Sequence, residues 1–98
     1  MERETPHTPE TLAPRVLEGR KVEEILKSEE FRAAIAKLRA AVYQEWIAAE
    51  TLEDREKAHG VTVGIERILD SLAVVVQDGE IAQEATRLMH ERDSRRED

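Results

Sequence analysis

The chain has 98 residues, and its 40% of hydrophobic and 38% of charged residues predict one small folded domain with a heavily solvated surface. Because cysteine is absent, disulfides and thiolate metal sites are excluded. The 22 acidic residues outnumber the 15 basic ones, which gives a formal charge of −7, and no segment is strongly basic. We therefore expect no direct binding of DNA or RNA.

The first part of the chain is polar, and we expect a flexible leader over residues 1–7. Thr8 followed by Pro9 is typical of a helix start, since proline at the first helical position loses no hydrogen bond. These signals predict a helix over about 8–27. Whether it breaks near Gly19 is left open by the sequence.

Ser28 begins the next predicted helix, over about 28–50, because its hydroxyl can accept a hydrogen bond from a free backbone N–H of the first turn. Two glutamates follow at the positive end of the helix dipole. The apolar residues then recur at helical spacing, which predicts one buried stripe. That stripe consists of Phe31, Ile35, Leu38, Val42 and Ala49, widened by Trp46.

Thr51 is the predicted cap of a further long helix, over about 52–77, in which apolar residues follow a heptad rhythm. The rhythm is carried by Ala58, Val61, Ile65, Ile68, Leu72 and Val75. Two antiparallel helices explain this pattern best. Gly60 and Gly64 share one face of the helix, where they mark a close contact with the opposite helix, a local kink or a later helix start.

Asp78-Gly79 is typical of a helix stop. We expect a last helix over about 80–91 and a frayed, charged tail over 92–98. The predicted fold is therefore all-α, with one helical domain over 8–91. In it, two long helices form an antiparallel hairpin, shorter helices flank them, and oligomerisation completes the bundle.

Residues suited to catalysis do not group in the sequence. His7, His59 and His90 lack the spacing of a metal site, and no serine has the surroundings of a nucleophile. Glu66 and Asp70 lie one turn apart and Glu45 could face them, but bases alternate with such carboxylates on any solvated helix face. We expect no enzymatic activity, metal, cofactor or small-molecule substrate.

The apolar face of the second long helix is wider than one partner helix needs. Either the flanking helices cover it, which gives a small bundle, or another protein or a second copy of the chain does. We expect Trp46 in the core and Tyr43 at the rim, where its ring could contact another subunit. The predicted interface comprises Tyr43, Trp46, Ile65, Ile68, Leu69, Leu72, Val75 and Val76.

A membrane location is not expected. The longest uncharged run falls far short of the ~20 apolar residues that a membrane span requires. The first residues also lack the pattern of a signal peptide, so we expect a cytoplasmic protein.

A resemblance to known proteins spans about two-thirds of the chain. The segments that carry it are 25–31, 43–46, 54–56, 65–69 and 75–79. Their order resembles that in small helical proteins encoded among the head-assembly genes of tailed phages and prophages. The two glycines at positions 60 and 64 depart from the uninterrupted second helix of those proteins. The resemblance implies virion assembly in a bacterial cytoplasm and no chemistry.

Two functions therefore remain open. The first is an oligomeric, non-enzymatic protein-interaction component, such as a scaffold or accessory factor in phage head or DNA-packaging assembly. The alternative is an acidic inhibitor or regulator that mimics nucleic acid and binds a DNA-handling protein. The first predicts association that survives high salt because apolar burial drives it, whereas the alternative predicts salt-sensitive binding.

Overall fold

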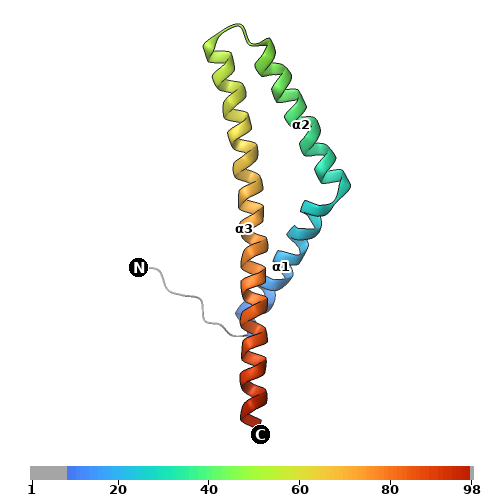
Figure 1. The fold of residues 1–98 in the computed structure, drawn as a ribbon, viewed down its shortest axis with the longest axis vertical. Coiled ribbons are helices and arrows are strands. Elements are labelled where there is room, and N and C mark those ends of the chain that lie inside the picture. Colours follow the sequence, from blue (N-terminus) through green and yellow to red (C-terminus); the bar gives the residue numbers. More distant parts are fainter. Residues whose placement is uncertain (1–8, 98) are drawn as a thin grey trace, which may run out of the picture. The chain divides into compact units, whose positions relative to one another are not determined.

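The computed structural model describes residues 9–97, which form three helices (Figure 1). They are α1 (Pro9–Lys27), α2 (Glu29–Ala48) and α3 (Leu52–Glu97). No strand occurs in this described part of the chain, so the predicted all-α class is confirmed. The leader predicted over 1–7 and the cap predicted at Thr8 lie outside the described residues.

Side-chain caps set the starts of α2 and α3. The Ser28 hydroxyl accepts a hydrogen bond of 3.1 Å from the N–H of Phe31 and donates one of 3.0 Å to the carbonyl of Ile25. One serine thus ends α1 and begins α2. The Thr51 hydroxyl accepts a hydrogen bond of 3.1 Å from the N–H of Asp54 in the first turn of α3. Both predicted caps are confirmed.

The predicted helix stop at Asp78-Gly79 is wrong, because α3 is one helix of 46 residues that runs through this point. The segment predicted as a separate helix over 80–91 is part of α3, which continues to Glu97 through the segment predicted to fray. Gly79 does not adopt the left-handed conformation of a helix end, since no described glycine has a positive φ. Likewise, α1 continues unbroken through Gly19.

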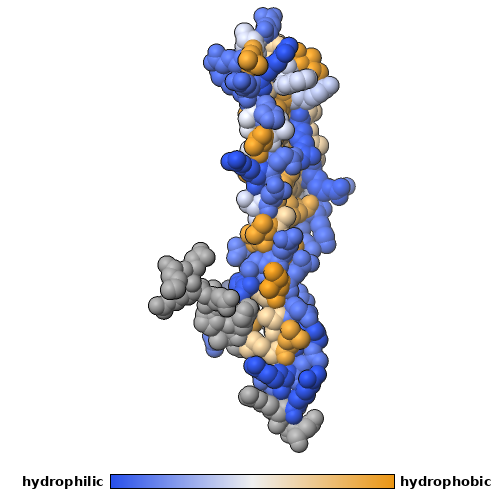
Figure 2. All heavy atoms as spheres, turned by 60° about the vertical axis from the view of Figure 1, so that its left-hand side comes forward, coloured by the Kyte–Doolittle hydropathy of each residue, from blue (hydrophilic) through white to orange (hydrophobic). Residues whose placement is uncertain are grey.

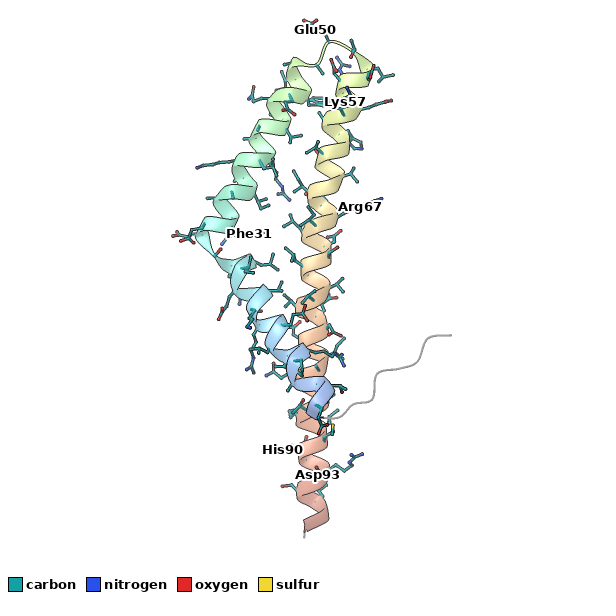
Figure 3. All side chains as sticks on the ribbon, turned by 180° about the vertical axis from the view of Figure 1, so that it is seen from behind. Phe31, Glu50, Lys57, Arg67, His90 and Asp93 are labelled. Carbon is teal, nitrogen blue, oxygen red and sulfur yellow. The ribbon has the colours of Figure 1, made fainter. Side chains whose placement is uncertain are left out.

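Packing divides the chain into two compact units. Unit 1 comprises Met1–Glu23 and Ala73–Asp98, and unit 2 comprises Glu24–Leu72. Unit 1 therefore combines most of α1 with the C-terminal half of α3. Unit 2 combines α2 with the N-terminal half of α3, and the connection between these two helices contains Glu50 (Figure 3).

Unit 1 is held together by direct backbone packing. A Cβ atom added to Gly19 would lie 2.8 Å from the Gly79 Cα, and one added to Gly79 would lie 2.9 Å from the Gly19 Cα. Only glycine permits two helices to approach this closely. In the same unit, Leu12 of α1 and Ala82 of α3 are almost completely buried, at 1% and 0% exposed.

Unit 2 has a core of side chains instead. Val42 of α2 packs with Ala58 and Ile65 of α3, and the half-buried Leu69 packs against this cluster. Of the readings left open for Gly60 and Gly64, the close contact with the opposite helix is wrong, because a Cβ added at either would meet nothing within 4 Å. Both glycines lie within the continuous α3, so a later helix start is excluded as well.

Candidate protein-interaction surface

Few apolar side chains are buried in the described part of the chain. Five form the core, whereas thirteen large hydrophobic side chains are exposed. Figure 2 shows hydrophobic side chains at the surface among hydrophilic ones. The exposed set comprises Leu17, Ile25, Leu38, Tyr43, Trp46, Ile47, Leu52, Val61, Val63, Ile68, Val74, Ile81 and Leu88. Single exposed apolar residues need no explanation, so only a contiguous group of them indicates a binding surface.

Tyr43 and Trp46 form such a group on α2. Their rings stack, with centroids 6.5 Å apart and planes 19° apart. Tyr43 is 59% exposed and Trp46 is 50% exposed. The core position expected for Trp46 is therefore wrong. Val42, one turn before it, belongs to the core against α3, whereas Trp46 lines a groove together with the polar His59 and Thr62 of α3.

The aromatic pair borders a groove of unit 2 that we call the α2–α3 groove. It is lined by Arg39, Val42, Tyr43, Trp46, His59, Thr62, Ile65 and Glu66. Buried Val42 and Ile65 belong to the core beneath it, and the aromatic rings stand at its edge. Across it, Arg39 donates a hydrogen bond of 2.6 Å to the Glu66 carboxylate. An apolar floor with a polar rim is the usual build of a protein-binding patch.

The other predicted interface residues differ in exposure and belong to different units. Ile68 is 60% exposed, whereas Ile65 is buried at 6% exposure and Leu69 packs on the core. Leu72 is half-buried in unit 2. Val75 and Val76 are also half-buried, but they belong to unit 1, where Val76 lies near the glycine crossing. The predicted surface is thus divided between the two units.

Ile47 was missed by the sequence reasoning, although it is 54% exposed beside the aromatic pair. It lies off the stripe that faces α3, so a search for one apolar stripe per helix passes over it. Counting every apolar residue at steps of three and four would have found it.

Arginine–carboxylate pairs supply the strongest electrostatic contacts. In unit 1, Arg15 donates hydrogen bonds of 2.9 and 2.8 Å to the two oxygens of Asp78. This bidentate pairing lowers the pKa of the Asp78 carboxyl and raises the pKa of Arg15. Arg87 pairs with Glu84 and Glu91 along α3, and its hydrogen bonds lower the pKa of Glu84. The first pair joins α1 to α3, and the Arg87 pairs lie along the exposed surface of α3.

The carboxylates that the sequence singled out have different surroundings. Glu66 is engaged by Arg39, and Glu45 lines a different hollow, with Asp54 and Lys57. Among the described residues, no group of three or more His, Asp or Glu side chains could hold a metal ion. No described helix is both long enough and apolar enough to span a membrane.

Comparison of the chain with protein-family models, with curated proteins and with solved structures finds no match in any of the three.

Proposed function

We propose that the chain is a non-enzymatic protein-interaction component, built as a helical hairpin, which binds a protein through the aromatic edge of the α2–α3 groove. The carrying observation is the stacked, half-exposed pair of Tyr43 and Trp46. Tyrosine and tryptophan are enriched at binding hot spots, because their rings bury a large area while losing little conformational freedom.

The position of the pair on a helix supports this proposal. Both rings project from α2, whose start is fixed by the Ser28 cap and whose Val42 is anchored in the core. The rings are therefore held in place before a partner arrives, which lowers the entropy cost of binding. Ile47 lies next to them and adds exposed apolar area.

A role as a scaffold or accessory factor in phage head or DNA-packaging assembly rests on the resemblance of sequence features alone. It would place the protein in a bacterial cytoplasm, as a homo-oligomer or bound to another assembly protein. The charge of −7 would keep such an assembly soluble and would favour a basic partner.

The nucleic-acid mimic is the weaker reading. A mimic needs unpaired carboxylates at regular spacing, but Glu66, Asp78, Glu84 and Glu91 each have an arginine partner on the same chain. Their charge is locally compensated, so they project less negative potential than a phosphate backbone does.

Site-specific photo-crosslinking in the native cell tests the proposal. A photoreactive phenylalanine analogue at Trp46 should yield a discrete crosslinked protein product on illumination. The matched control carries the analogue at Arg67, which is exposed on α3 and points away from α2 (Figure 3). Products from Trp46 and none from Arg67 are expected. Absence of any protein product from Trp46 would overturn the proposed function.

A further inference from the structure

A second apolar stripe, which we call the outer stripe, runs along an exposed side of α2, beside the α2–α3 groove. It consists of Ala33, Ala36, Ala40, Tyr43 and Ile47, at successive steps of three, four, three and four. All five residues are exposed, so nothing within the described part of the chain covers them. The outer stripe lies next to the line of Ile35 and Val42 that faces inward, since Tyr43 borders the α2–α3 groove and Ala36 lines a neighbouring hollow with Ile35. Its spacing is that of the a and d positions of a coiled coil.

We infer that the outer stripe is the seam of a homodimer, in which α2 of two copies packs antiparallel about a two-fold axis near Ala40. The inference rests on the proposed function and names a second copy of the chain as the partner. The sizes along the stripe decide the direction of pairing. The three alanines come first and the two large side chains come last. A parallel pair would therefore set Tyr43 against Tyr43 and Ile47 against Ile47.

An antiparallel pair solves this problem of size. It sets Ile47 of one copy against Ala33 of the other, and Tyr43 against Ala36, with Ala40 meeting Ala40 on the axis. Each large side chain then fills the space above a small one, as close packing requires. The stripe thus fits a second copy of itself that runs in the opposite direction, and such self-complementarity is the condition for a two-fold interface.

Charge favours α2 over α3 as the contact between copies. α2 carries three acidic residues and three basic ones, so it is formally neutral. α3 carries eleven acidic residues against seven basic ones, so pairing two copies through α3 would bring like charges together. Two α2 helices can approach without this net repulsion.

The residues beside the stripe fit the same arrangement. The two-fold places Arg32 of one copy near Trp46 of the other, where a guanidinium can stack on the exposed indole ring. Lys37 of one copy comes near Gln44 of the other, which brings no like charges together. Arg39 lies close to the axis, and its charge is compensated by Glu66 of its own chain.

Molecular mass in solution tests whether the dimer forms. Sedimentation equilibrium of the full chain should give about twice the monomer mass of 11.2 kDa, in low salt and in 1 M salt alike, because apolar burial drives the contact. Ala40→Glu should weaken dimerisation by 100-fold or more, since it buries a charge on the axis. Ala41→Glu is the matched control, one position further on the same exposed helix, and should leave the mass unchanged.

Cysteine crosslinking tests the direction of pairing, and the absence of native cysteine makes each introduced thiol unique. Ala40→Cys should form a disulfide-linked dimer under mild oxidation, whereas Ala41→Cys should not. When Ala33→Cys and Ile47→Cys chains are mixed, the mixed disulfide should dominate over either homodimeric one. Homodimeric disulfides at positions 33 and 47 would show a parallel pair and overturn the inference.

The two proposals can fail separately. A chain that is monomeric at 100 µM, yet gives crosslinks from Trp46 to a different protein in the cell, would overturn the homodimer and leave the proposed function intact. A dimer insensitive to Ala40→Glu would also overturn the inference, since the contact would then lie elsewhere. Circular dichroism of the two glutamate variants verifies that both fold as the parent chain does.

Discussion

The two units join their helices by different means. In unit 1, α1 and α3 meet backbone to backbone at Gly19 and Gly79, and one bidentate ion pair sits beside the crossing. In unit 2, α2 and α3 are kept apart by side chains, and the glycines there face open space. A contact between backbones tolerates no added atom, whereas a contact between side chains can be repacked. The helix contact of unit 1 therefore depends on two residues without side chains, whereas that of unit 2 depends on buried side chains.

The largest difference in the free energy of unfolding should appear between alanine substitutions at two isoleucines of α3 in unit 2. Ile65→Ala removes a buried side chain from the three-residue core and should lower the free energy of unfolding by about 2–4 kcal/mol. Ile68→Ala, at an exposed position three residues later, should cost less than about 0.5 kcal/mol in the monomer. Urea unfolding followed by circular dichroism measures both. Equal losses would mean that the core is not at Ile65.

Replacing a glycine by alanine should change the free energy of unfolding by a smaller amount, and in opposite directions in the two units. Gly79→Ala places a methyl group against the backbone of α1 and should destabilise unit 1 by about 1–3 kcal/mol. Gly60→Ala meets open space within a helix and should stabilise the chain by about 0.5–1 kcal/mol.

Hydrogen exchange detected by mass spectrometry locates these glycine effects. Gly79→Ala should speed exchange in α1, because a helix of 19 residues that contains Pro14 is marginal without its packing. Exchange in α2 provides the internal reference. Slower or unchanged exchange in α1 would contradict the close crossing.

The smallest expected effect is the dependence of stability on pH that arises from the ion pair of unit 1. Because Arg15 lowers the pKa of Asp78 in the folded chain, the ion pair contributes stability above the ordinary pKa of 3.8. This contribution is lost as the pH falls below 3.8 through the lowered pKa. Asp78→Asn should flatten that part of the curve of stability against pH, and Asp70→Asn, an exposed control in unit 2, should not. Urea unfolding between pH 2 and pH 6 measures the difference, which is limited by the partial exposure of both partners.

The starts of α2 and α3 could be predicted because their causes are local. Ser28 and Thr51 each satisfy a backbone N–H three residues ahead, so a short stretch of sequence contains the whole interaction. The all-α class follows equally from local spacing. Neither depends on which helices touch.

The role of Gly79 could not be predicted in the same way, because its cause is distant in sequence. Gly79 follows an aspartate and so has the local pattern of a helix stop, yet α3 continues through it. A glycine is required at position 79 because the backbone of Gly19 packs directly against it. The neighbouring ion pair joins residues 63 positions apart. One signal was available, since Leu12, Arg15 and Gly19 follow helical spacing on α1, as do Val75, Gly79 and Ala82 on α3.

For the surface, the sequence indicated the aromatic residues and misplaced one of them. Periodicity assigns Trp46 to the inward stripe, but it does not show that Trp46 lines a groove with the polar His59 and Thr62 of α3 and is half exposed there. Tyr43 is exposed. Its contact with another subunit stays a prediction.

The stacked ring pair also provides an optical probe that needs no label. Trp46 is the only tryptophan and Tyr43 the only tyrosine, and 6.5 Å separates their ring centroids. At that separation the tyrosine passes its excitation to the indole, so emission should come almost wholly from Trp46. A half-hydrated indole emits at long wavelength, and covering it shifts the emission towards the blue. The fluorescence of the unmodified chain can therefore follow occupancy of α2 in titrations and in stopped-flow mixing.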